Sequence, residues 1–142
     1  MATTDKTPKF EGYSQINRPR LRENLARGGG VMILIRKEIA FQEVTCPDTD
    51  KNPGMERISI ELATADDSLI VTNLYYPPVS AAGMDSSSKQ IHVRPRSREI
   101  ITGDLNAHHE MWDKSGSDER GNNLAECVIE NNSIITNNGT PT

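Results

Sequence analysis

Residues 56–76 constrain the possible folds of this chain more than any other stretch, because two strand patterns follow each other across a turn signal. In residues 56–63, ERISIELA, apolar and polar side chains alternate, as in a strand with one buried face. Residues 69–76, LIVTNLYY, follow the turn sequence ADDS and carry apolar side chains on both faces. Such a strand is typical of the centre of a sheet that is covered on each side. These residues therefore predict a hairpin whose second strand is central in its sheet.

The size and charge of the chain limit the classes of protein to which it can belong. Its 142 residues correspond to one domain at most, large enough to bury about 68% of the surface of the unfolded chain. Aromatic residues make up only 4% of the chain, so aliphatic side chains must fill the core. The net charge of -4 argues against a protein that coats nucleic acid, although an enzyme could still meet DNA through a local patch.

Neither a membrane partner nor secretion is predicted. No stretch approaches the ~20 consecutive apolar residues of a membrane span. The first ten residues, MATTDKTPKF, lack the apolar core of a signal peptide. Cys46 and Cys127 have no CxxC spacing, which indicates neither a zinc site nor a disulfide framework. An intracellular, reducing setting fits this pattern.

Weaker patterns flank the central hairpin on its N-terminal side. Residues 1–27 are polar and charged, and we expect a solvated lead-in that is partly disordered. Residues 31–36, VMILIR, follow three glycines and predict a strand. Residues 41–46 predict a second strand, which could pair with the first as a hairpin.

The C-terminal third predicts one helix. Residues 119–131 place apolar side chains on one face, with Ser117 or Asp118 as the N-cap, and residues 133–136 predict a short strand after it. Residues 79–98 show no clear period and favour a solvated loop. The alternative for that segment is contact with a nucleic-acid backbone through its basic residues Lys89, Arg94, Arg96 and Arg98.

A cluster of polar side chains follows a short strand pattern at residues 99–102. Residues i and i+2 of an extended chain point to the same side, and the rim of a sheet is open to water and substrate. A carboxylate there can hold a proton or a metal-bound water, and a carboxamide both donates and accepts hydrogen bonds. An ordinary polar loop is an equally good interpretation of these residues alone. The strand pattern ends at Gly103, and the cluster consists of Asp104, Asn106, His108 and His109.

Residues 103–113, GDLNAHHEMWD, resemble a segment of the endonuclease/exonuclease/phosphatase superfamily that reads GDFNAHH-x-x-W in non-LTR (LINE-type) retrotransposons. The superfamily shares the Asp104 and Asn106 pair with AP endonucleases and pancreatic DNase. The continuation His108, His109 and Trp112 is particular to the retrotransposon branch. Further segments agree in the same order, namely residues 28–39, 73–78 and 118–142.

The resemblance implies an α/β (α+β) fold, a partial four-layer α/β sandwich of the DNase/AP-endonuclease type with a mainly antiparallel sheet and a flanking helix. Residues 28–142 would form a partial domain. It would lack the N-terminal strand with the family's metal-binding glutamate and the C-terminal Ser-Asp-His segment. Gln42-Glu43 matches the letters of the glutamate motif, but it follows the glycine-led strand and is not predicted to be the metal site.

The resemblance also implies hydrolysis of a phosphodiester with Mg²⁺ (or Mn²⁺) as cofactor. The substrate would be DNA, and the nick would prime reverse transcription. A reverse transcriptase domain of the same polyprotein and a nuclear location are expected with that activity. His-His-x-x-Trp and DERG argue against the alternative of a superfamily phosphatase acting on a phosphoinositide or sphingolipid. A non-catalytic remnant of the domain is the third possibility.

By the same resemblance, three residues would act on the substrate. Asp104 would orient and deprotonate the attacking water and would also be a metal ligand, although the main glutamate ligand of the family is absent from this chain. Asn106 would fix that water and the phosphate, and Tyr75 would donate to a phosphate oxygen. Contacts to phosphate or DNA are also expected from His108, His109 and Asn73.

Three other residues are expected to support the site. Trp112 should anchor the loop by packing its indole inward. Asp118 and Arg120 lie in the retrotransposon-type DxRG pattern and are expected to form a structural ion pair that braces the active-site loop.

Overall fold

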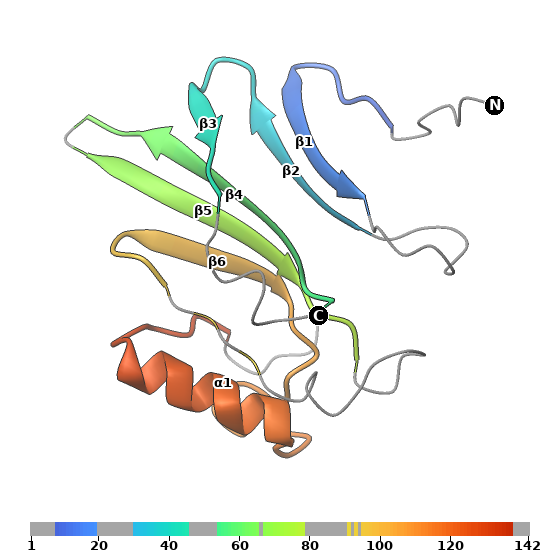
Figure 1. The fold of residues 1–142 in the computed structure, drawn as a ribbon, viewed down its shortest axis with the longest axis vertical. Helices are drawn as coiled ribbons and strands as arrows, with labels where there is room; N and C mark the ends of the chain where they lie inside the picture. The colour runs from blue at the N-terminus through green and yellow to red at the C-terminus, as the bar shows by residue number, and fades with distance from the viewer. Residues whose placement is uncertain are drawn as a thin grey trace.

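The computed structural model describes residues 8–19, 30–45, 54–65, 67–78, 91, 93 and 95–137. These residues form six strands and one helix (Figure 1). In chain order the elements are β1 (Tyr13–Pro19), β2 (Gly30–Arg36), β3 (Phe41–Glu43), β4 (Glu56–Ala63), β5 (Ser68–Tyr75), β6 (Glu99–Asp104) and α1 (Glu119–Glu130).

The strands form two sheets. The larger has the order β3-β4-β5-β6, and the smaller consists of β1 and β2. All pairs are antiparallel except β5 with β6, which is parallel. The predicted hairpin of residues 56–76 is confirmed as β4 and β5, and β5 is central as expected.

The two faces of β5 are buried against different layers. On one face, Val71 and Tyr75 pack against a cluster that includes Val31 of β2 and Ile58 of β4, so this core lies between the two sheets. On the other face, Leu74 and Tyr76 pack with residues that include Leu124 of α1 (Figure 1). This double coverage is the reason why β5 carries apolar side chains on both faces.

The mixed α/β fold class, mostly antiparallel with a flanking helix, is confirmed by this arrangement. The predicted helix is also confirmed, with Asp118 as its N-cap and Asn131 as its C-cap. No helix in the part of the chain that the structure describes is long and apolar enough to cross a membrane.

The N-terminal strands pair differently from the prediction. Within the predicted lead-in, Tyr13–Pro19 forms β1 and pairs with β2. The predicted hairpin of residues 31–36 with residues 41–46 is wrong, because β3 pairs with β4 instead. The short turn after β2 carries the chain from one sheet to the other, and Phe41 joins the core between the sheets. Residue 46 lies outside the described residues.

The strand predicted at residues 133–136 is wrong. This segment has no strand assignment, and Ile134 is 89% exposed, so its apolar side chain does not join a sheet core. In the segment 79–98, Lys89 and Arg94 lie outside the described residues. Two residues of that segment, Ile91 and Val93, are buried against Leu74 and Tyr76.

Candidate active site

Tyr75 and Asp104 are neighbours at the ends of the two parallel strands. They are register partners in the β5–β6 pair, and the backbone NH of Tyr76 donates to the carbonyl oxygen of Asp104 at 2.8 Å. Residues in register on adjacent strands project to the same face of a sheet. The face is the one toward β2, because Tyr75 packs against the core between the sheets. The expectation that residues 73–76 and 100–106 lie side by side is therefore confirmed.

Gly103 allows β6 to lie close enough to β5 for this arrangement. The sequence predicted that the strand ends at Gly103, but β6 continues through it to Asp104. Gly103 has a φ of +136°, and a Cβ at this position would lie 1.8 Å from the carbonyl oxygen of Leu74. Only glycine fits this approach, so the position of Asp104 depends on the absence of a side chain one residue earlier.

Asn106 connects the ends of both strands. Its backbone NH donates to Oδ1 of Asp104 at 3.0 Å, and its Nδ2 donates to the carbonyl oxygen of Tyr76 at 3.0 Å. Its φ of +45° lies in the left-handed region, which Asn tolerates better than most residues. The carboxamide that was predicted to meet water and phosphate is thus held beside Asp104 by the chain itself.

Glu56 is a residue that the sequence interpretation missed. It is the antiparallel register partner of Tyr75, so Glu56, Tyr75 and Asp104 form one row across β4, β5 and β6. Glu56 is half-buried, and its Oε2 is shielded from solvent. The predicted hairpin could have identified Glu56 as a neighbour of Tyr75. Pairing Ala63 with Ser68 and counting outward along both strands places residue 56 opposite residue 75.

Asn73 has a different environment from the one predicted for a phosphate contact. Its side chain is half-buried, and Nδ2 donates to the carbonyl oxygen of Met32 at 3.1 Å. This hydrogen bond connects β5 to β2 across the core between the sheets. Asn73 therefore lies two residues deeper in the sheet than Tyr75, with its amide group turned toward the smaller sheet.

Trp112 holds the loop that follows β6. Its indole is 9% exposed, and Nε1 donates to the carbonyl oxygen of Ala107 at 2.9 Å. The predicted inward packing of this side chain is confirmed. A large buried aromatic group with its polar atom satisfied is well suited to fixing a loop.

Arg120 and Asp118 contact the backbone of the same loop. Nη1 of Arg120 donates to the carbonyl oxygens of Pro77 at 2.8 Å and Leu105 at 3.0 Å. The guanidinium also lies 4.1 Å from the centroid of the Tyr76 ring. Burial lowers the pKa of Arg120, and the nearby charges of Tyr76 and Asp118 oppose that shift.

The contacts of Asp118 run to backbone NH groups. Its Oδ1 accepts from Gly121 at 2.6 Å as the cap of α1, and from His108 at 3.3 Å. The sequence predicted that Asp118 and Arg120 brace the loop as an ion pair. In the structure, the hydrogen bonds that connect Asp118 and Arg120 to the loop are made with backbone groups of the loop.

The two adjacent histidines have different partners. Nδ1 of His108 is hydrogen-bonded to Oδ2 of Asp113. That hydrogen bond raises the pKa of His108 above its ordinary value of 6.5 and contributes most to lowering the pKa of Asp113 to about 2. His109 accepts a hydrogen bond from the backbone NH of Met111 at 3.2 Å, and its ring packs on Trp112 with 5.0 Å between centroids.

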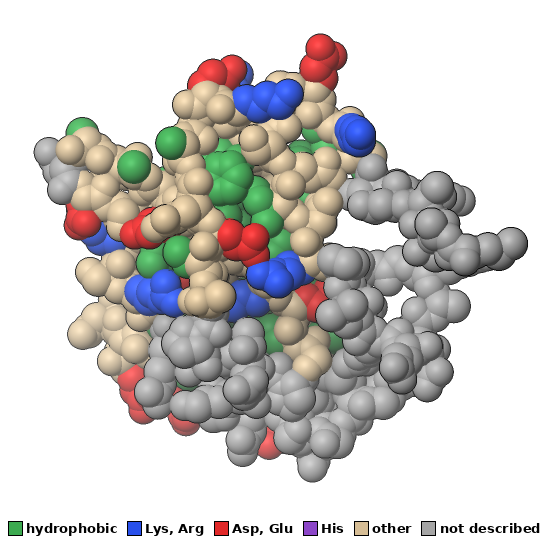
Figure 2. Space-filling view, turned by 45° about the horizontal axis from the view of Figure 1, so that its top comes forward, with side chains coloured by type: hydrophobic (Ala, Val, Ile, Leu, Met, Phe, Trp, Pro, Cys, Tyr) green, Lys and Arg blue, Asp and Glu red, His purple; other side chains and the backbone are tan. Residues whose placement is uncertain are grey.

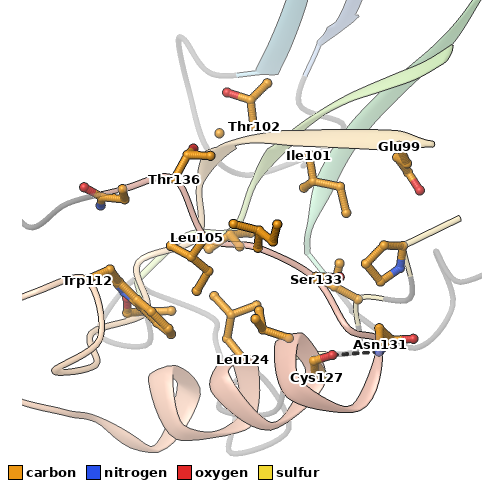
Figure 3. A pocket seen from close by; sticks show the side chains of 18 of the residues that line it. Glu99, Ile101, Thr102, Leu105, Trp112, Leu124, Cys127, Asn131, Ser133 and Thr136 are labelled. Carbon is orange, nitrogen blue, oxygen red and sulfur yellow. Dashed lines mark hydrogen bonds between the residues drawn. The ribbon is translucent and has the colours of Figure 1, made fainter. Parts of the chain in front are cut away.

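An open groove of about 1610 Å³ lies between β6, the loop after it and α1. Figure 3 shows apolar side chains of both walls pointing toward it, including Leu105, Trp112 and Leu124. Asp104 and His108 line one end of the groove. Of the polar cluster predicted from the sequence, Asp104, Asn106 and His108 line this groove.

The basic residues Arg96 and Arg98 lie at the opposite end of β6. Nη1 of Arg98 contacts Oδ2 of Asp67 at 2.9 Å, and Nη2 of Arg96 donates to the carbonyl oxygen of Thr45 at 2.8 Å. Figure 2 shows Lys and Arg side chains interspersed with Asp and Glu on the visible face, without a continuous basic surface. Because Arg96 and Arg98 precede the start of β6, the length of that strand separates them from Asp104 at its end.

The residues at the strand ends fit a divalent cation that is shared with its substrate. In the described parts of the chain, no three His, Cys, Asp or Glu side chains converge on one point. Asp104 is exposed and Glu56 flanks Tyr75 on the other side. Mg²⁺ often takes only one or two carboxylates and completes its shell with water and substrate phosphates, so Asp104, with or without Glu56, would be enough to hold it.

Glu43 lies far from these carboxylates in the sheet. It is the last residue of β3, at the edge opposite β6, and its carboxylate pairs with Arg18.

Comparisons with known proteins agree with this fold. The chain has a TM-score of 0.58 and 17% identity to a solved structure, the "Endonuclease domain of TRAS1, a telomere-specific non-LTR retrotransposon". That match covers 94% of this chain but 59% of the TRAS1 domain. No curated protein matches the chain. The family described as endonuclease-reverse transcriptase matches residues 69–142, which include β5, β6 and α1. The chain therefore belongs to the endonuclease-reverse transcriptase family.

Proposed function

We propose that this chain is the DNA-nicking part of a retrotransposon-type polyprotein and hydrolyses phosphodiesters with Mg²⁺ (or Mn²⁺). The observation that carries the proposal is the register of Tyr75 with Asp104, with Asn106 hydrogen-bonded to both strand ends. A phenol, a carboxylate and a carboxamide at the ends of two adjacent strands provide the groups that an in-line attack of water on a phosphodiester requires. Membership of a nuclease family supports the same activity.

Each residue has a distinct task in this mechanism. Asp104 accepts the proton of the attacking water, and the backbone NH of Asn106 holds one of its carboxylate oxygens in place. The Tyr75 hydroxyl donates to a non-bridging phosphate oxygen as negative charge develops there. Asp104 and Glu56 would hold the divalent cation, which supplies positive charge to the phosphate when bound.

DNA is the proposed substrate because of the family to which the chain belongs and because TRAS1, whose endonuclease domain has the same fold, is a telomere-specific retrotransposon. The chain spans 59% of the length of that domain, so its substrate and partners are inferred. A reverse transcriptase domain of the same polyprotein would extend the nicked strand. That role requires access to chromosomal DNA, and we therefore propose a nuclear location.

Nicking of supercoiled plasmid by the purified chain with Mg²⁺ tests the proposal. We expect relaxed plasmid with the wild-type chain and a loss of about 10²–10⁴-fold in Asp104→Asn, because the general base is removed without a change of shape. Glu56→Gln should also reduce nicking, by about tenfold or more, and should raise the Mg²⁺ concentration needed. Asp67→Asn is the matched control, because Asp67 lies in the β4–β5 turn and pairs with Arg98.

Two outcomes would overturn the proposal. Nicking that persists in Asp104→Asn would show that the activity belongs to another site or to a contaminant. Absence of nicking at every Mg²⁺ and Mn²⁺ concentration would show a non-catalytic remnant of the domain.

A further inference from the structure

We propose that the His108 ring, oriented by Asp113, binds a phosphate of the cleaved DNA strand, whereas His109 only supports the loop. The inference rests on the proposed function and divides the His-His pair into two unequal members. It assigns the ligand contact to one imidazole, held by one carboxylate, at the end of the groove that Asp104 also lines.

The backbone of His108 is held from three directions. Its carbonyl oxygen accepts from the NH of Asp118 at 2.9 Å, and its own NH donates to Oδ1 of Asp118 at 3.3 Å. Gly121 packs against the same carbonyl, since a Cβ at residue 121 would lie 1.7 Å from that oxygen. The start of α1 therefore fixes the position of the His108 backbone, from which the side chain projects.

The orientation of the His108 ring is set by Asp113. Nδ1 faces Oδ2 of Asp113, and Oδ1 of Asp113 accepts from the NH of Ser115 at 2.9 Å, so the carboxylate is itself held. With Nδ1 engaged, Nε2 is directed to the other side of the ring. The His108 side chain is 54% exposed, which leaves that edge accessible to a ligand.

The charge of the ring suits an anionic ligand. The hydrogen bond to Asp113 is the main cause of the raised pKa of His108, burial opposes it, and the carboxylates of Asp118 and Asp104 add to the rise. The ring is therefore an imidazolium over a wider pH range than a free histidine. A charged N–H donor makes a shorter and stronger hydrogen bond to a phosphate oxygen than a neutral one.

His109 lacks these properties. Its Nδ1 accepts a hydrogen bond from the backbone NH of Met111. Its ring packs on Trp112, whose indole is itself hydrogen-bonded to Ala107. The two histidines are adjacent in sequence, but it is the His108 ring that is held by a carboxylate and directs its Nε2 outward.

Binding of DNA without cleavage tests this assignment. The probe is a fluorescein-labelled duplex of about 20 base pairs, followed by anisotropy in EDTA while pH and salt are varied. For the wild-type chain we expect the affinity to fall about tenfold between about pH 6 and about pH 8.5, as the imidazolium loses its proton.

His108→Gln should bind about tenfold more weakly at about pH 6, should lose the pH dependence, and should lower the salt slope of log K by about one. Asp113→Asn should move the fall in affinity to lower pH. His109→Phe keeps the packing on Trp112 and is the matched control, with an unchanged pH profile. If His108→Gln fails to fold, Asp113→Asn decides the question through the shift in pH profile.

The outcomes separate this inference from the proposed function. An unchanged pH profile in both His108→Gln and Asp113→Asn overturns the inference, and so does equal loss of affinity in His109→Phe. Absence of any DNA binding overturns it as well. If nicking that depends on Asp104 is observed in any of these cases, the proposed function stands without it.

Discussion

Arg120 is 1% exposed, although it carries a charge that water would otherwise stabilise. The backbone carbonyls of Pro77 and Leu105 and the face of the Tyr76 ring replace water around its guanidinium. These partners come from the chain just after β5 and just after β6. One side chain of α1 thus holds together the two strand ends that carry Tyr75 and Asp104.

Arg120→Lys is expected to reduce the free energy of unfolding by about 2–4 kcal/mol, because an ammonium group cannot reach both carbonyls and cover the ring. Urea denaturation measures this loss. Arg98→Lys is the control, because the exposed pair with Asp67 should change stability by less than about 0.5 kcal/mol. Equal stability of Arg120→Lys and the wild-type chain would contradict the role assigned to Arg120.

The pair of His108 and Asp113 predicts how stability changes with pH. The pKa of His108 is raised in the folded chain, so its stabilising effect is complete below about pH 6.5 and is lost as pH rises through the raised pKa. The pKa of Asp113 is lowered from 3.8 to about 2, so its effect is present above 3.8 and is lost as pH falls toward 2.

We therefore expect the urea midpoint of the wild-type chain to exceed that of Asp113→Asn most between about pH 4 and about pH 6.5. The difference should shrink on both sides of that window. Urea titrations of both chains at several pH values measure it. A difference that is the same at every pH would show that Asp113 acts without its charge.

At the scale of elements, the close pairing of β6 with β5 determines the site. The parallel register places Asp104 beside Tyr75, and antiparallel pairing of β4 with β5 adds Glu56 to the same row. Each side chain comes from a different strand, so none of the three can be moved without a shift of a whole strand. Gly103 is the position where this pairing is most sensitive to substitution.

Gly103→Ala should reduce stability by about 3 kcal/mol and reduce nicking strongly, because a Cβ at 1.8 Å from the Leu74 oxygen must push the strands apart. Gly116→Ala is a matched control, since Gly116 has a φ of +116° but no atom within 4 Å of the added Cβ. It should lose only about 1 kcal/mol, from backbone strain. Urea denaturation and the plasmid assay compare the two, and similar losses in both variants would contradict the argument.

For the whole molecule, net charge limits how DNA can be held. The chain carries a net charge of -4, and ion pairs such as Arg18–Glu43 and Arg98–Asp67 occupy part of its basic surface. The face shown in Figure 2 carries no continuous basic surface, and DNA contact is expected around the strand ends.

The salt dependence of DNA binding should accordingly be shallow. With two or three phosphates contacted, we expect log K to fall with log salt with a slope of roughly −2 to −3. Anisotropy titrations with NaCl at a fixed pH measure the slope. A slope steeper than about −6 would require many more phosphate contacts and would contradict a local site.

Local patterns were sufficient for much of this fold. Alternation in residues 56–63 and the doubly apolar strand after it predicted the central hairpin, because both depend on side-chain spacing within one segment. The cap and extent of α1 followed from Asp118 and the apolar spacing after it. Local patterns do not specify which distant segments pair with each other, and the predicted partners of β2 and β3 were therefore wrong.

The sequence by itself determined that an acid and an amide two residues apart, Asp104 and Asn106, lie at the end of a strand. Only the tertiary structure decided what surrounds them: Glu56 across the hairpin, Asn73 turned toward Met32, and two adjacent histidines with different partners. The reason is physical. Spacing along a strand or helix sets which side a residue faces, but the groups that it meets there come from strands and loops whose pairing is settled only when the chain folds.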